Sequence, residues 1–424
     1  MPETMLCWKN SVKGDNMLPD VQLKIKNDTV YFNFLDTRYF KTKSVYIKYD
    51  FNIQKVPHHI FNFMMGMILS EYLSWDGGNL NFTELTENEI RCINAHIRAN
   101  FIANPYELVK SSNPGIVTSI KYAGLDGYRD SGLVLCSNGM GKDGLLTQDI
   151  LSEIDLPVKV FTVGGYYKNN NSFMNRVNSS KEYTSTLGFE YSVIDTNIIK
   201  LLRLGLKIMP WWLFGLPIAF DLGAKNIFEG FEISFSKTHL ATHLPPRPNA
   251  SIFSQKYLSD ATGVSFSSPI CCLTQYGIQK MLFDRYPKAL PYQKSCMRKN
   301  PACGSPACGK CFMNSLYAQA AGYDPALISL PVISKKGYKA IHPFDEDCIS
   351  FALSKINGKS YLDWYEKASG YALQNMLYGD EISAIIKQNY DVYWDDPGID
   401  GLGYEYIPSK WKDLLDSNIF EKGI

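Results

Sequence analysis

Residues that could bind phosphate stand together in the string CSNGMGKDGL, residues 136–145. The string follows an apolar segment predicted as a strand, 133–136, and leads into a segment with the apolar spacing of a helix, 145–154. A glycine-containing turn at such a position points backbone N–H groups and the positive end of the helix dipole at its ligand. Lys142 adds a formal positive charge, and Asp143 indicates a Mg²⁺ ion that bridges to nucleotide phosphates. The alternative is an ordinary strand-to-helix turn whose glycines only give backbone freedom.

A second group of reactive residues is a cysteine cluster, residues 296–311, in the string SCMRKNPACGSPACGKC. Its glycines and prolines allow tight turns, so that four thiolates can converge on one ion. Four sulfur ligands without an open position are typical of structural Zn²⁺. Independent buried cysteines and a redox CxxC pair are the alternatives. The predicted zinc ligands are Cys296, Cys303, Cys308 and Cys311.

Composition limits the classes of function. The 424 residues suffice for two or three domains, and 43 basic against 42 acidic residues leave no charge excess for nonspecific nucleic-acid binding. We therefore expect no obligate nucleic-acid partner. The most apolar window, 208–220, is too short to cross a bilayer, and residues 1–16 lack the apolar segment of a signal peptide. We expect a cytoplasmic protein with reduced cysteines; the oligomeric state stays open.

The elements that must position these residues fall into three predicted regions. Residues 1–115 read as an α+β module, with strands between residues 21 and 50, a helix over 57–72 and a second helix announced by the capping box Thr86-x-x-Glu89. Residues 116–334 alternate strands with helices and apolar segments, and residues 335–424 read as helical. The strands predicted in the second region are 133–136, 158–163, 191–194 and 227–231.

Alternation of this kind predicts an α/β fold, with a parallel sheet covered by helices on both faces. Ligands of such sheets bind at the carboxyl ends of the strands, which is where the 136–145 turn falls.

Further candidates follow the last of these strands. Glu229 and Glu232 flank Gly230 at the strand end, where they could contact Mg²⁺ or a substrate amine, although carboxylates there often cap helices. His239 and His243 could transfer protons near neutral pH, or could simply be exposed loop residues.

The phosphate turn and the cysteine cluster together resemble the PP-loop ATP pyrophosphatase superfamily, whose adenine nucleotide alpha hydrolase-like domains carry a loop of the type SGGxDS. The corresponding residues are 139–144, GMGKDG. Met140 stands where the motif has a glycine and Gly144 where it has a hydroxyl residue, for which Ser137 is the candidate replacement. The resemblance implies a Rossmann-like fold, ATP as substrate and the nucleotide contacts Ser137, Asn138, Gly139, Gly141, Lys142, Asp143 and Gly144.

Two branches of this superfamily are similar in detail. The order Ser268-Pro269, helix 274–283, Ser295-Cys296 and Cys308-Gly309-Lys310-Cys311 resembles 7-cyano-7-deazaguanine synthases. The N-terminal module and the loop resemble the UDP-N-acetylmuramoyl-L-alanyl-L-glutamate epimerase family, which has a strand-end Gly-Asn-Glu where this chain has Gly-Phe-Glu, ending at Glu232. That likeness extends over roughly residues 20–330 and implies the substrate contacts Asn249, Ser254 and Lys256.

These likenesses imply an ATP-dependent enzyme that adenylates a small-molecule or peptide carboxylate and releases AMP and pyrophosphate. Adenylation would lead to epimerisation or to amide or nitrile formation, with Lys142, Asp143, Glu232 and His239 as the candidate catalytic residues. The alternative, motivated by the changes at Met140 and Gly144, is a degenerate nucleotide-binding and zinc-stabilised interaction protein without adenylation activity.

Overall fold

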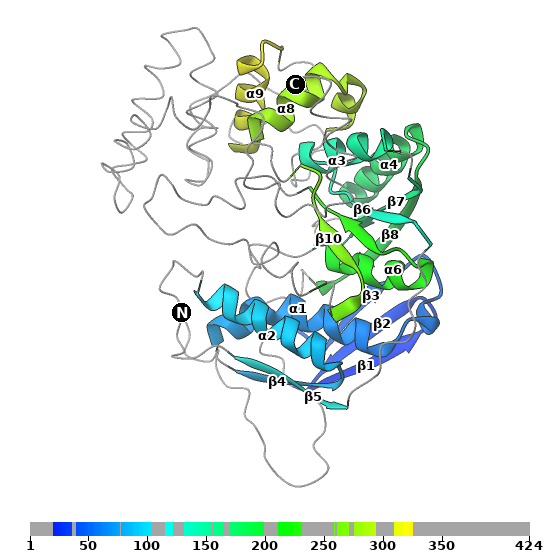
Figure 1. Ribbon diagram of the computed structural model, residues 1–424, viewed down its shortest axis with the longest axis vertical. Helices are drawn as coiled ribbons and strands as arrows, with labels where there is room; N and C mark the ends of the chain where they lie inside the picture. Colours follow the sequence, from blue (N-terminus) through cyan, green and yellow to red (C-terminus); the bar gives the residue numbers. More distant parts are fainter. Residues whose placement is uncertain are drawn as a thin grey trace, which may run out of the picture.

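The described part of the chain folds around one sheet (Figure 1). The computed structural model describes residues 20–35, 40–76, 78–102, 115–121, 131–154, 156–164, 170–198, 211–230, 258, 261–270, 275–293 and 309–324. Within these residues ten strands form a continuous sheet in the order β10-β9-β6-β7-β8-β3-β2-β1-β4-β5.

One half of the sheet is entirely parallel. Its strands are β6 (Val134–Ser137), β7 (Val158–Val163), β8 (Glu190–Thr196), β9 (Asn226–Phe228) and β10 (Ser265–Ser267). The chain begins in the middle with β6, moves outward through β7 and β8, and then returns to the other side of β6 for β9 and β10. The strand order therefore reverses between β6 and β9, and this topological switch point is where open α/β sheets bind their ligands.

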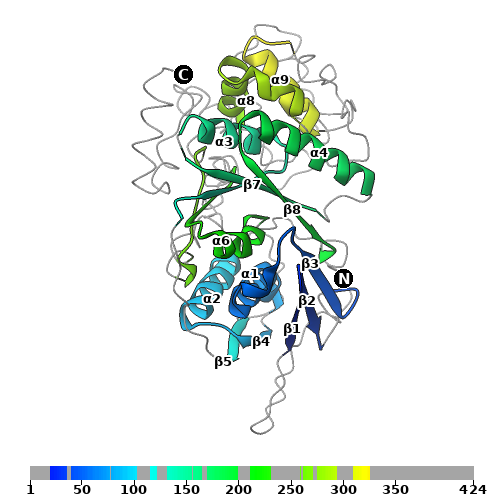
Figure 2. The ribbon, with the colours of Figure 1, turned by 90° about the vertical axis from the view of Figure 1, so that its right-hand side faces the viewer.

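Both faces of the parallel half are covered, as Figure 2 shows. On one face Val134 and Cys136 join an apolar core with α3 and α8; on the other, Leu135 packs in the core that contains Trp212 and Phe214. Alternate side chains of β6 therefore pack in two different cores, one on each face of the sheet. This arrangement confirms the predicted parallel sheet between helices. The helical elements are α3 (Lys142–Ser152), α4 (Asn170–Thr186), α8 (Gln275–Asp284), α9 (Gly309–Ala320), α6 (Leu216–Leu222) and the 3₁₀ helices η2 (Trp211–Gly215) and η4 (Pro287–Tyr292).

The N-terminal half is an antiparallel meander extended by two parallel strands. Its elements are β1 (Val21–Lys26), β2 (Thr29–Phe34), β3 (Ser44–Lys48), β4 (Asn79–Glu84), β5 (Ile116–Lys121), the short η1 (Ile53–Lys55), α1 (His58–Asp76) and α2 (Glu87–Ile102). The two halves meet where β3 pairs antiparallel with β8, through Ile47 opposite Thr196 and Lys48 opposite Asp195. The strand at the start of the predicted second region, β5, pairs with β4 at the far edge of the sheet.

The capping box predicted before α2 is confirmed. The Glu89 N–H donates to Thr86 Oγ1 at 3.2 Å, and the Thr86 N–H donates to Glu89 Oε2 at 2.7 Å. The other Glu89 oxygen lies 2.7 Å from Nδ1 of the buried His59, so the cap also ties α2 to the first turn of α1.

One helix of the parallel half, α4, has no counterpart in the sequence analysis. Its buried face carries Arg176, Ser180 and Thr184 at the i, i+4 and i+8 positions, so the helical period is polar and a search for apolar spacing misses it. Two predicted boundaries also shift: the helix predicted from residue 145 begins at Lys142, and the strand predicted over 227–231 ends at Phe228.

The apolar window 208–220 contributes η2 and α6, not a long helix. Among the described residues, no helix combines the length and the apolarity that crossing a membrane requires.

Candidate functional site

The loop that joins β6 to α3 lies at the switch point of the parallel strands. Gly141 is the N-cap of α3, with φ −77° and ψ 169°, and no side chain caps the helix there. The first-turn N–H groups of a helix lack partners within that helix. The N-terminus of α3 is therefore suited to bind an anion.

The end of β9 comes against the start of α3. A Cβ atom added to Gly230 would lie 2.8 Å from both the carbonyl carbon and the Cβ of Asp143. Such close backbone approach is possible only for glycine. The residues after β9 therefore pack directly against the beginning of α3.

Lys142 and Asp143, the charged residues of the loop, contact each other. Lys142 Nζ lies 2.5 Å from Asp143 Oδ1, and the two side chains are 8% and 33% exposed. The carboxylate of Asp143 is accessible at the helix start. A single carboxylate of this kind fits Mg²⁺, which takes most of its remaining ligands from phosphate and water.

Met140, at the position where the motif has a glycine, has a backbone conformation that is typical of glycine. Its φ is 60°, in the left-handed region. Asn138 stabilises this conformation, because its Oδ1 accepts the Met140 N–H at 2.7 Å. The Met140 side chain is fully buried in the core beneath α3. Burial of a side chain of this size offsets the cost of about 1–2 kcal/mol for the left-handed conformation.

Gly144, which replaces a hydroxyl residue of the motif, faces the same asparagine. A Cβ atom at position 144 would lie 2.8 Å from Asn138 Oδ1. A serine there would collide with the amide that holds Met140 in place. Asn138 Oδ1 therefore lies against both Met140 and Gly144.

Residues of β7 and α4 hold the loop in place through hydrogen bonds. Asn138 donates from Nδ2 to Ser180 Oγ at 2.9 Å, and its carbonyl accepts from Thr162 Oγ1 at 2.8 Å. Arg176, 8% exposed, donates from Nη1 to the carbonyl of Gly139 at 2.8 Å. The sequence analysis missed these supports, and the signal that could have found them is the polar i, i+4, i+8 spacing on α4.

The polar contact between α3 and α4 continues behind the loop. The Tyr183 hydroxyl donates to Asp149, and Thr184 Oγ1 donates to Gln148 Oε1 at 2.9 Å. Burial raises the pKa of Asp149 to about 7, against the opposing effect of the Tyr183 hydrogen bond. This carboxyl is therefore partly protonated near neutral pH and supports the packing of α3 on α4.

Glu229, at the end of β9, is a partly buried acid without a full set of partners. Its Oε2 atom is buried and has no hydrogen-bond partner among the described residues. Burial raises the pKa of Glu229 well above its ordinary value. Burial, together with the Glu229 charge, also raises the pKa of the Cys136 thiol on β6. Glu229 thus lies near both strands of the switch point, in the setting typical of functional carboxyls.

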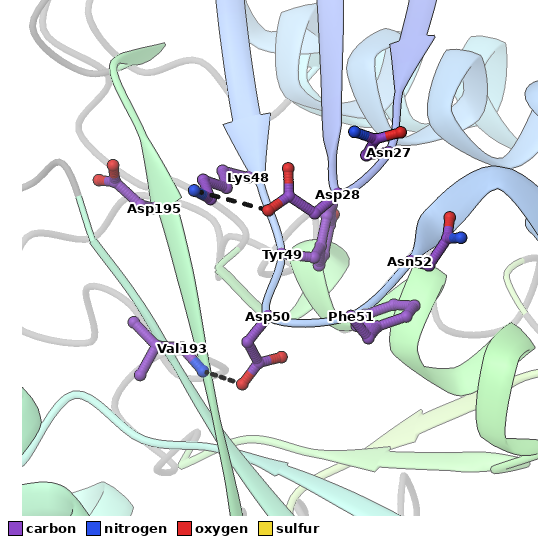
Figure 3. A pocket seen from close by; sticks show the side chains of 9 residues that line it. All are labelled: Asn27, Asp28, Lys48, Tyr49, Asp50, Phe51, Asn52, Val193 and Asp195. Carbon is purple, nitrogen blue, oxygen red and sulfur yellow. Dashed lines mark hydrogen bonds and ion pairs between the residues drawn. The ribbon is translucent and has the colours of Figure 1, made fainter.

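The structure also has an open cavity of about 520 Å³ at the junction of β3 and β8, separated from the loop by β7 (Figure 3). Its carboxylates are engaged in local structure: Asp28 lies 3.5 Å from Lys48 Nζ, Asp50 accepts the Val193 N–H at 3.1 Å, and Asp195 accepts the Tyr46 hydroxyl at 3.1 Å. The contacts of Asp50 and Asp195 join the N-terminal strands to β8.

The structure brings the loop residues of the predicted site together, namely Ser137, Asn138, Gly139, Gly141, Lys142, Asp143 and Gly144. Cys311, of the predicted zinc ligands, is buried in the first turn of α9. Within the described ranges, no group of three or more His, Cys, Asp or Glu side chains could hold a metal ion. The other predicted site residues lie outside those ranges: Glu232, His239, Asn249, Ser254, Lys256, Cys296, Cys303 and Cys308. The predicted helical region 335–424 lies outside them as well.

No protein-family model matches the sequence, and no curated protein matches it. One similar solved structure is U34-tRNA thiolase NcsA from Methanococcus maripaludis, determined with its [4Fe-4S] cluster. The TM-score is 0.27 at 12% identity, and the alignment covers 42% of this chain and 64% of that chain, less than two thirds of the thiolase.

Proposed function

We propose that this chain is an ATP-dependent enzyme of the PP-loop pyrophosphatase type, which adenylates a carboxylate substrate and releases pyrophosphate. One observation carries the proposal: the loop with the motif-like string GMGKDG joins β6 to α3 at the switch point of a parallel sheet, with the end of β9 packed against it. Helix starts at such points are suited to nucleotide phosphates.

In this proposal the loop amides and Lys142 hold the phosphates that leave as pyrophosphate. Asp143 would hold a Mg²⁺ ion, which offsets the negative charge of the phosphates. The α-phosphorus then faces the strand ends, where a carboxylate can attack it. Adenylation converts a poorly reactive carboxylate into an activated acyl group.

Adenylation of the carboxylate can lead to more than one reaction. In an acyl-adenylate the α-proton is more acidic and the carbonyl carbon is more electrophilic than in the free carboxylate. An epimerase would use the first property and an amide- or nitrile-forming ligase the second. Glu232 and His239 remain candidates for proton transfer, and Asn249, Ser254 and Lys256 remain candidates for substrate contacts.

A structural Zn²⁺ ion held by Cys296, Cys303, Cys308 and Cys311 remains part of the proposal. The described member of this set, Cys311, is buried in the first turn of α9. The metal would then contribute to folding and take no part in catalysis.

The nucleotide products test the reaction class. Incubation with Mg·ATP and a panel of amino-acid and peptide carboxylates should give substrate-dependent AMP and pyrophosphate, separated by ion-exchange chromatography. Exchange of the substrate α-proton in ²H₂O would indicate an epimerase, and a requirement for ammonia or an amine would indicate a ligase. Substrate-dependent ADP would contradict the proposal. ATP binding without any turnover would favour the degenerate nucleotide-binding protein.

Substitutions in the loop test the binding site. Lys142→Ala should weaken Mg·ATP binding by about tenfold or more, because a charge-assisted contact to phosphate is lost. Asp143→Ala should weaken binding in Mg²⁺ but not in EDTA, where the variant removes the ion pair with Lys142 and no contact with the metal. Titration calorimetry in both buffers measures the two effects, with Lys310→Ala, an exposed residue of α9, as control. Equal affinities for the wild type and both loop variants would place the nucleotide elsewhere.

A further inference from the structure

We propose that Asn138 is a positioning residue of the loop between β6 and α3: it holds Met140 in the left-handed conformation before any ligand binds. Asn138 thereby replaces the conformational freedom that a glycine gives the motif at this position. The inference rests on the proposed function and makes residues 138 and 140 a functional pair.

The Asn138 side chain contacts Met140 at two points. Its Oδ1 atom accepts the Met140 N–H at 2.7 Å, and its Nδ2 atom donates to Met140 Sδ at 3.2 Å. A bond from an asparagine oxygen to the N–H two residues ahead closes an Asx turn, which fixes the backbone locally. Both residues are buried, so little water competes for these contacts. One amide group therefore holds both the backbone and the side chain of Met140.

Two hydroxyl groups from outside the loop set the orientation of this amide. Asn138 Nδ2 donates to Ser180 Oγ of α4 at 2.9 Å, and the Asn138 carbonyl accepts from Thr162 Oγ1 of β7 at 2.8 Å. The two hydroxyl oxygens lie 3.2 Å apart. Because Thr162 gives its one proton to the carbonyl, Ser180 donates to Thr162 and accepts from the amide. The opposite orientation of the amide would place its NH₂ group against the Met140 N–H, so the Asn138 oxygen is directed to Met140.

The conformation of Met140 determines where the neighbouring backbone N–H groups point. Asn138 uses the Met140 N–H, whereas the N–H groups of Gly139 and Gly141 have no hydrogen-bond partner among the described residues. Gly141 is also the N-cap of α3, so a rotation at Met140 would move the loop relative to the helix start. Without the Asn138 oxygen, a methionine would favour other backbone conformations than the left-handed one. Only a fraction of the chains would then have the loop ready for phosphate, and the apparent affinity would fall by that fraction.

A double-mutant cycle between residues 138 and 140 tests this inference, because a glycine adopts the left-handed conformation without help. Asn138→Ala should weaken Mg·ATP binding by about tenfold in the chain with Met140, but by less than about threefold in the Met140→Gly chain. Titration calorimetry on the full chain measures the affinities of the wild type, the two single variants and the double variant. Urea unfolding shows whether each protein is folded. Asn178→Ala, which removes an exposed asparagine of α4, is the control and should change affinity by less than about twofold.

Two further variants keep the test decisive if a protein of the cycle does not fold. Met140→Gly removes a buried side chain and lowers stability. Met140→Asn can take its place, since asparagine tolerates the left-handed region better than methionine does. Ser180→Ala leaves Asn138 and Met140 intact but frees the amide to turn, and it should weaken Mg·ATP binding by about threefold or more.

Two results of the cycle would overturn the inference. Asn138→Ala could bind Mg·ATP as the wild type does. It could also weaken binding by the same factor in the Met140 and Met140→Gly chains, which would make Asn138 a support of the fold that does not act through Met140. If Asn138→Ala does not fold, wild-type affinity in Ser180→Ala overturns the inference instead. A wild-type chain that binds no Mg·ATP contradicts the proposed function itself, whereas an unaffected Asn138→Ala beside an ATP-binding wild type contradicts only the role of Asn138.

Discussion

Replacing Gly230 with alanine should displace the first turn of α3 and cost the protein both stability and nucleotide affinity. The added methyl group would lie 2.8 Å from two atoms of Asp143, one of them in the backbone, so neither partner can move away without shifting the loop. Overpacking of this kind costs about 1–3 kcal/mol. We expect Mg·ATP affinity to fall by about tenfold or more, because a small displacement of positioned groups has a large effect on binding and catalysis.

Chemical denaturation and calorimetry measure the two effects of Gly230→Ala. The steric control is Gly139→Ala, since a Cβ atom at Gly139 meets nothing within 4 Å and should leave stability unchanged. A Gly230→Ala protein with wild-type stability and affinity would show that β9 and α3 do not approach each other as described.

Replacing Glu229 with glutamine should stabilise the protein, and the gain should grow with pH. Burial raises the pKa of Glu229 in the folded state well above its unfolded value. Above about pH 4.3 the unfolded chain therefore loses this proton while the folded chain keeps it, so wild-type stability falls as pH rises toward the folded pKa. Glutamine carries no such proton, and at pH 7–8 its gain should be about 1–3 kcal/mol.

Urea unfolding between pH 4 and pH 8 measures this dependence. Wild type and Glu229→Gln should be equally stable at the acidic end and should diverge above it. Glu190→Gln, with a side chain 75% exposed on β8, is the control that should show no divergence. If the difference in unfolding free energy between the two proteins is the same at every pH, the effect of the substitution comes from packing and not from ionisation of Glu229. If Glu229→Gln is more stable but also has lower enzymatic activity, the Glu229 carboxyl lowers stability and contributes to the function of the site.

The parallel half of the fold could be predicted from the sequence because its signals are local. The apolar run 133–136, the glycine turn and the following helical spacing each depend on a few neighbouring residues. The same holds in the N-terminal half for the Thr86-x-x-Glu89 capping box, which has the predicted reciprocal hydrogen bonds. Strand order could not be obtained in this way. The sequence does not show that β5 returns to β4 or that β3 joins β8, since those pairings join residues distant in the chain.

The charged loop of the candidate site could also be predicted, but its supports could not. Lys142 and Asp143 stand in a recognisable string, whereas Arg176 and Ser180 lie on a helix with few apolar residues. The coupling of Asn138 with Met140 and Gly144 depends on a collision between atoms, and no spacing rule reveals it. Glu229 is one of two acids predicted at the strand end, and the burial of its Oε2 atom can be seen only in three dimensions.

The pairing of β3 with β8 has a consequence for any attempt to shorten this protein. β3 pairs with the last two residues of β8, Asp195 and Thr196, so without β3 this end of β8 would become an unpaired edge of the parallel half. Such an edge recruits strands from other molecules and promotes aggregation. The N-terminal strands therefore act as a protective border for the half that carries the loop. A truncation that begins at residue 116 would remove this border, so the smallest fragment that can stay monomeric must retain the meander as well as the loop.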